Sequence, residues 1–144
     1  MKLLFVVENN QPHASAGGYY ALFKFADFLA RRGHETLLYA VNDRAWGRPS
    51  RELRIVYRPS IPRRNRALRK LDKMLAAACD RLILARETRA LRPDWILGVF
   101  TESAIKAAAL GRRHGARVAN FIYECPPWVR EKVGEERFGR EYVG

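Results

Sequence analysis

Residues 1–40 alternate between apolar, polar and amphipathic stretches in an order that few folds accommodate. The run from Leu3 to Val7 is continuously apolar, which is typical of a strand covered by helices on both faces. Apolar residues then recur at helical spacing from Tyr20 to Leu29, and a second strand is expected over Thr36 to Val41. This order predicts a βαβ unit with two parallel strands.

The polar loop between the first strand and the first helix ends in two glycines, Gly17 and Gly18. Glycines at this position leave backbone N–H groups and the positive end of the helix dipole open to an anion such as phosphate. The alternative is a tight strand-to-helix connection, because the rest of the dinucleotide-binding fingerprint is missing. His13 and Ser15 lie in the same loop, as ligand contacts or as solvated polar residues.

The chain continues the alternation of strands and helices to residue 123. Further strands are expected at 53–57, 95–99 and 117–123, a long helix before Pro93 and a helix over 104–114, with Gly33 and Gly115 as helix-ending glycines. The pattern predicts an α/β fold, a Rossmann-like doubly wound parallel sheet, with its ligand at the C-terminal ends of the strands.

Three polar loops should meet at that edge: 8–18, 100–103 and 124–128. Their acidic members are Glu102 and Glu124, and either carboxylate could orient or deprotonate an acceptor hydroxyl. The alternative for Glu102 is a structural one, because a negative charge is favoured near a helix N-terminus.

The long helix before Pro93 carries an apolar stripe with lysines and arginines on its other side. Its members are Leu68, Leu71, Leu75, Ala78, Leu82, Ala85 and Leu91. The stripe is expected to pack into the core under a solvated basic face. A functional alternative is that the basic segment 63–73 contacts acidic membrane lipid.

Composition bounds the function classes. With 27 Lys and Arg against 15 Asp and Glu, the net charge is +12, which favours anionic partners. The basic segment has no interleaved aromatic residues to stack on bases, so nucleic acid is not expected as a partner. Two cysteines make neither a disulfide framework nor a metal site. No apolar run approaches the ~20 residues of a membrane span, and a cytoplasmic location is expected.

Several short motifs together resemble the N-terminal half of GT-B glycosyltransferases of the family 4 type. These are the Gly17-Gly18 start of the first helix, its Leu29 to Glu35 end (LARRGHE), the Arg92-Pro93-Asp94 lead into a strand, and Gly115 to Val118 before the last strand. The resemblance covers nearly the whole chain.

The resemblance implies retaining transfer of a sugar from a nucleotide-sugar co-substrate, without a metal or other cofactor. Gly17 and Gly18 would approach the donor diphosphate or sugar, while His13, Ser15 and Tyr123 would lie on the acceptor side. Many family members have a histidine before an acidic residue after the fifth strand. This chain has Tyr123-Glu124 there, so Glu124 is the closer catalytic match, with Glu102 the second candidate.

The family's donor-binding C-terminal domain does not fit in 144 residues. We therefore expect residues 1–130 to form the acceptor-side domain and 131–144 a charged tail or the start of an interdomain segment, incomplete without the donor domain. The acceptor is unidentified, and a lipid-linked one would suit the peripheral membrane contact considered for segment 63–73. The alternative function is a non-enzymatic, flavodoxin-like module that binds a nucleotide or a protein partner.

Overall fold

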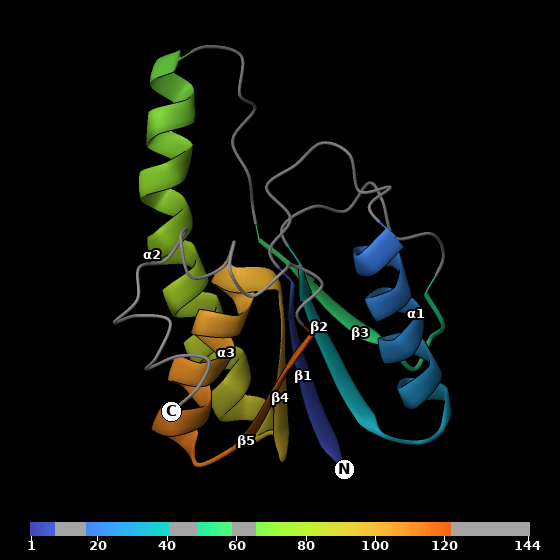
Figure 1. Cartoon of the computed structure of the whole chain (residues 1–144). Helices are drawn as coiled ribbons and strands as arrows, with labels where there is room; N and C mark the ends of the chain where they lie inside the picture. The colour runs from blue at the N-terminus through green and yellow to red at the C-terminus, as the bar shows by residue number, and fades with distance from the viewer. Residues whose placement is uncertain (8–16, 41–48, 59–65, 122–144) are drawn as a thin grey trace.

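The computed structural model describes residues 1–7, 17–40, 49–58 and 66–121, with the side chains of 17–19, 66–70, 72, 73 and 100–102 not described. In chain order the elements are β1 (Lys2–Val7), α1 (Gly17–Arg31), β2 (Glu35–Ala40), β3 (Arg54–Tyr57), α2 (Arg66–Leu91), β4 (Trp95–Val99), α3 (Phe100–His114) and β5 (Arg117–Phe121) (Figure 1). The predicted alternation of strands and helices is confirmed.

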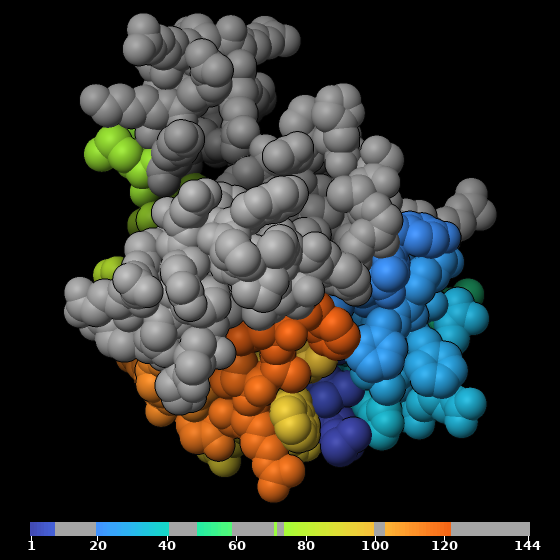
Figure 2. All heavy atoms as spheres, in the orientation of Figure 1, coloured from blue at the N-terminus to red at the C-terminus, as the bar shows by residue number. Residues whose placement is uncertain are grey.

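The strands form one five-stranded sheet in the order β3-β2-β1-β4-β5, with every neighbouring pair parallel. In Figure 2 the colours at one edge of the sheet run across the surface in the same order, with the dark blue N-terminal residues between β4 and β2. The predicted Rossmann-like, doubly wound α/β fold is therefore confirmed.

Helices cover both faces of the sheet, which explains the continuous apolar run of β1. Leu3, Phe5 and Val7 pack with α1 on one face, whereas Leu4 and Val6 pack with α2 and α3 on the other. All five side chains are at most 4% exposed. Because successive side chains of a strand point to opposite faces, a strand buried on both sides must be apolar throughout.

Glycines end two of the helices as the sequence predicts. Gly33 has φ 85° and Gly115 has φ 69°, a left-handed conformation that costs glycine little. After α1, the N–H of His34 donates to the carbonyl of Leu29 over 3.2 Å, and after α3 the N–H of Ala116 donates to Gly111 over 3.1 Å. These bonds satisfy helix carbonyls and turn the chain directly into the next strand.

The apolar stripe predicted for α2 does not pack into the core, so this expectation is wrong. Leu71 and Leu75 are each 45% exposed, Leu82 is 71% exposed and Ala78 is exposed, whereas Ala85 is half-buried and Leu91 is buried. The side chain of Leu68 lies outside the described residues. The first half of α2 extends beyond the carboxyl edge of the sheet (Figure 1). The helix turns a different face inward, on which Asp80, Leu84, Glu87 and Thr88 are buried.

The predicted loop over residues 100–103 is also wrong, because α3 begins at Phe100, directly after β4. The compact turn depends on Gly98. A Cβ built there would lie 2.6 Å from the Cα of Ala104 and 2.8 Å from the carbonyl oxygen of Ser103. Both are backbone atoms, so α3 would have to move away from the sheet.

We expect Gly98→Ala to destabilise the fold by about 3 kcal/mol, the upper part of the range for overpacked sites. Urea denaturation of both proteins measures the loss. Gly33→Ala is the matched control, since its added Cβ meets nothing within 4 Å and only its positive φ is strained, at about 1 kcal/mol. Equal losses for the two variants would contradict the close approach of α3 to β4.

Candidate functional site

The strand order creates a switch point between β1 and β4. From β1 the chain passes through α1 to β2 on one side, and from β4 it passes through α3 to β5 on the other. Because α1 and α3 lie on opposite faces of the sheet, their first residues flank the carboxyl ends of these two strands (Figure 1). In open α/β sheets this is where ligands bind.

Gly17 and Gly18 are the first two residues of α1, as predicted from the sequence. The first turn of α1 contains no acidic residue that would neutralise the positive end of the helix dipole. This end of α1 is therefore electrostatically suited to an anion, although binding of phosphate there stays a prediction.

Glu102 lies in the first turn of α3 and not in a loop. The residue before the helix, Val99, has an extended backbone and makes no side-chain capping bond. The capping alternative for Glu102 required a position near a helix N-terminus, and this position is confirmed. Glu102 lies at the same edge of the sheet as Gly17 and Gly18. Its catalytic role remains a hypothesis.

The other predicted site residues, His13, Ser15, Tyr123 and Glu124, lie outside the described residues. Of the three polar loops predicted to meet at this edge, 100–103 is the start of α3, and residues 8–16 and 124–128 lie outside the described residues. The strands that precede them, β1, β4 and β5, are adjacent and parallel. Within residues 1–7, 17–40, 49–58 and 66–121, no group of three His, Cys, Asp or Glu side chains is placed to hold a metal ion.

The most connected polar group in the described part of the chain is the carboxylate of Asp80, in α2. It accepts hydrogen bonds from the hydroxyl of Tyr39 and from Lys106 Nζ, the latter over 2.5 Å. Arg58 NH1 lies 3.3 Å from each of its oxygens. Tyr39 belongs to β2, Arg58 follows β3 and Lys106 belongs to α3, so this Asp80 cluster joins four elements.

Within the Asp80 cluster, the side chains of Asp80 and Arg58 are only 4% and 2% exposed, whereas the side chain of Lys106 is 31% exposed. Burial by itself raises the pKa of Asp80. Hydrogen bonds from Lys106 and Tyr39 and the charges of Lys106 and Arg58 outweigh burial and hold that pKa below its ordinary value. A carboxylate that already accepts from three side chains is a structural anchor, not a free general base.

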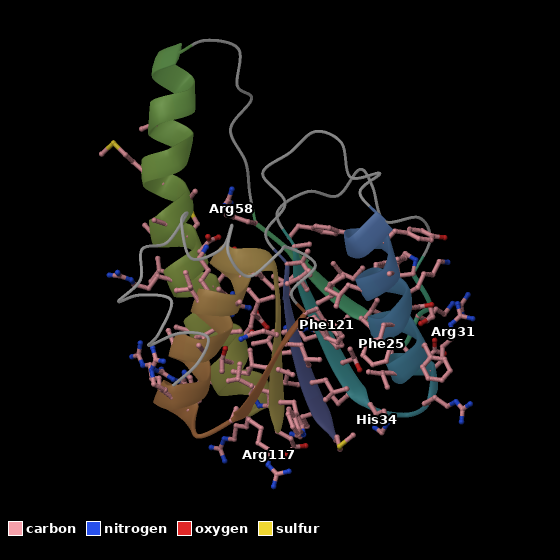
Figure 3. All side chains as sticks on the ribbon, in the orientation of Figure 1. Phe25, Arg31, His34, Arg58, Arg117 and Phe121 are labelled. Atoms are coloured by element: carbon pink, nitrogen blue, oxygen red, sulfur yellow. The ribbon has the colours of Figure 1, made fainter. Side chains whose placement is uncertain are left out.

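Arg58 lies at the carboxyl edge of the sheet, beside α2 (Figure 3). Its backbone N–H continues the β2–β3 pairing by donating to Ala40 over 2.9 Å. The sequence analysis did not find Tyr39, Arg58, Asp80 or Lys106. The one available signal was Asp80 itself, a carboxylate inside an amphipathic helix, and hydropathy does not reveal its distant partners.

Neither models of protein families nor curated protein sequences match this chain.

We expect Asp80→Asn to destabilise the fold by about 3 kcal/mol, because it leaves the charge of Arg58 buried without its anion. Thermal and urea denaturation measure the loss. Glu35→Gln is the control, since Glu35 pairs with Lys2 over 3.5 Å with both side chains about half exposed, and it should change stability by less than about 0.5 kcal/mol. A similar small effect of Asp80→Asn would show that the cluster is not an anchor.

The same carboxyl should contribute to acid unfolding. Its pKa is lower in the folded protein than in the unfolded chain, so its stabilisation is present above the unfolded pKa of about 3.9 and is lost as the pH falls through the folded value. We expect the free energy of unfolding to decline on acidification below about pH 4, and to decline less steeply in Asp80→Asn. If the free energy of unfolding fell equally steeply with acidification in the two proteins, Asp80 would not be the source of the acid sensitivity.

Proposed function

We propose that this chain is the acceptor-side domain of a retaining GT-B glycosyltransferase, which moves a sugar from a nucleotide sugar to an acceptor. The observation that supports it best is the pair of helix N-termini, α1 at Gly17 and α3 at Phe100, on either side of the β1–β4 switch point. The α1 N-terminus, which has no acidic residue in its first turn, suits a phosphate group, and the α3 N-terminus brings Glu102 to the same edge. The sequence resemblance supplies the reaction class, which the fold alone does not.

In this proposal Gly17 and Gly18 approach the donor diphosphate or sugar, because a helix start without Cβ atoms lets backbone N–H groups reach phosphate oxygens. Glu124 and Glu102 are the catalytic candidates, and His13, Ser15 and Tyr123 face the acceptor. The nucleotide sugar is a co-substrate, and no metal is required. The donor nucleotide is held by a second domain, so this chain alone should bind weakly and not turn over.

Isothermal titration calorimetry with UDP-glucose and GDP-mannose tests the proposal on this chain and on one extended by about 200 downstream residues, roughly one further domain. We expect measurable binding and sugar transfer only with the extended chain. The double variant Gly17→Ala, Gly18→Ala should weaken binding about tenfold by obstructing the N-terminal amides.

The alanine pair is not expected to act through unfolding, because alanine favours a helix more than glycine does. Lys24→Ala introduces alanine into the third turn of the same helix and should leave the affinity unchanged. If folded proteins of both lengths fail to bind any nucleotide sugar, the glycosyltransferase proposal is overturned.

The second candidate function is a non-enzymatic module that binds a nucleotide or a protein partner. The observation that favours it is the exposed apolar side of α2, which a domain with only a small-molecule site does not need. Binding of free nucleotides by this chain, without any transfer by the extended one, would favour the module.

A further inference from the structure

The solvent side of α2 is apolar over three turns. Four members of the stripe predicted from the sequence are exposed, namely Leu71, Leu75, Ala78 and Leu82, and Met74 beside them is exposed as well. From here on, the apolar stripe means these five residues. Met74 is 67% and Leu82 is 71% exposed, with Leu71 and Leu75 at 45%. Leu71, Leu75, Ala78 and Leu82 follow helical spacing on one line, opposite the buried residues Asp80, Leu84 and Leu91.

The same line continues into two exposed arginines, Arg86 and Arg89. They stand four and seven residues after Leu82, so they share its side of the helix. Arg86 has an 82% exposed side chain, and Arg81, on the flank of the stripe, is exposed as well. Arginine can keep its stem on an apolar surface while its guanidinium contacts phosphate.

Two of the three acidic residues of α2, Asp80 and Glu87, are turned the other way, and the side chain of the third, Asp72, is not described. Asp80 is paired with Arg58 and Lys106, and Glu87 is paired with Arg54 Nη2 over 2.5 Å and with the exposed Arg86 Nε over 3.6 Å; the Asp80 and Glu87 side chains are at most 5% exposed. From Met74 to Leu91 the solvent side of α2 therefore combines apolar and cationic groups, and the two carboxylates of this stretch, Asp80 and Glu87, are buried against cations.

A second copy of the chain fits this surface poorly. Two molecules of charge +12 repel each other before they meet. A stripe of five side chains on one helix also offers less than the roughly 800 Å² per partner of a typical stable interface. An anionic bilayer attracts the charge and accepts apolar side chains without shape complementarity.

We propose that the outer side of α2 is a docking surface for an anionic lipid bilayer. The apolar stripe enters the boundary between headgroups and acyl chains, while Arg86 and Arg89 contact lipid phosphates. The helix lies along the interface, and no helix in the described part of the chain is long and apolar enough to cross it. The docking surface is independent of the glycosyltransferase proposal.

Vesicle flotation of the whole chain tests the proposal. We expect binding to phosphatidylcholine vesicles with about 30% phosphatidylglycerol at low salt, little binding to phosphatidylcholine alone, and release at about 0.5 M salt. Leu75→Ser with Leu82→Ser should weaken partitioning at least about tenfold, because both side chains lose their insertion energy. Arg86→Gln with Arg89→Gln should weaken it about thirtyfold.

Control variants test whether binding depends on this surface or only on the total charge and exposed apolar area of the protein. Arg51→Gln with Arg113→Gln removes two exposed arginines outside α2, and should weaken binding by less than about threefold because the charges lie off the docking surface. Phe28→Ser removes a 50% exposed side chain from α1 and should have no effect. All substituted side chains are exposed, and circular dichroism verifies the folds.

Three results would overturn the proposal. The first is no flotation of the wild-type chain with anionic vesicles at low salt, and the second is equal flotation of the wild type and the serine variant. The third is a lipid-free dimer in sedimentation velocity that the serine variant converts to monomers, which would make a second copy the occupant of the stripe.

Discussion

The orientation of α2 depends on the burial of two of its carboxylates, those of Asp80 and Glu87. A carboxylate without a partner is too costly to bury, so each must pair with a cation. Asp80 pairs with Arg58 and Lys106, and Glu87 pairs with Arg54. Satisfying both pairs fixes the rotation of α2 about its axis. Once Asp80 and Glu87 face the domain, Leu71, Leu75 and Leu82 must face solvent.

A second constraint, the parallel sheet, determines where a ligand can bind. Right-handed connections place α1 on one face and α3 on the other, so the chain diverges at the carboxyl ends of β1 and β4. The N-terminus of α1 provides backbone donors and partial positive charge with no acidic residue in its first turn, whereas the first turn of α3 contains Glu102. The N-terminus of α1 at this edge suits recognition of a phosphate group.

The sheet was predictable from the sequence because its signals are local. The unbroken apolar run of β1 predicts a buried strand, and Gly33 and Gly115 predict the ends of helices. Each of these predictions needs only the neighbouring residues in the sequence. The missing loop at Phe100 was not predictable in this way, because the direct start of α3 depends on the close approach of Ala104 to Gly98. For the predicted site, the sequence was sufficient to place Gly17, Gly18 and Glu102 near the N-termini of two helices. Their roles were not predictable, because a role depends on the position of the ligand, which residue spacing does not determine.

The apolar stripe of α2 shows why hydropathy alone gave the wrong inner face. Leucines at helical spacing normally mark the side of a helix that packs on the core. Here the opposite side carries Asp80 and Glu87, whose partners in other elements lie 22 to 41 residues away in sequence. The helix also starts beyond the carboxyl edge of the sheet, the edge of the β1–β4 switch point (Figure 1). If both proposals hold, a bilayer against α2 would bring a lipid-linked acceptor to the end of the molecule where the nucleotide sugar is expected.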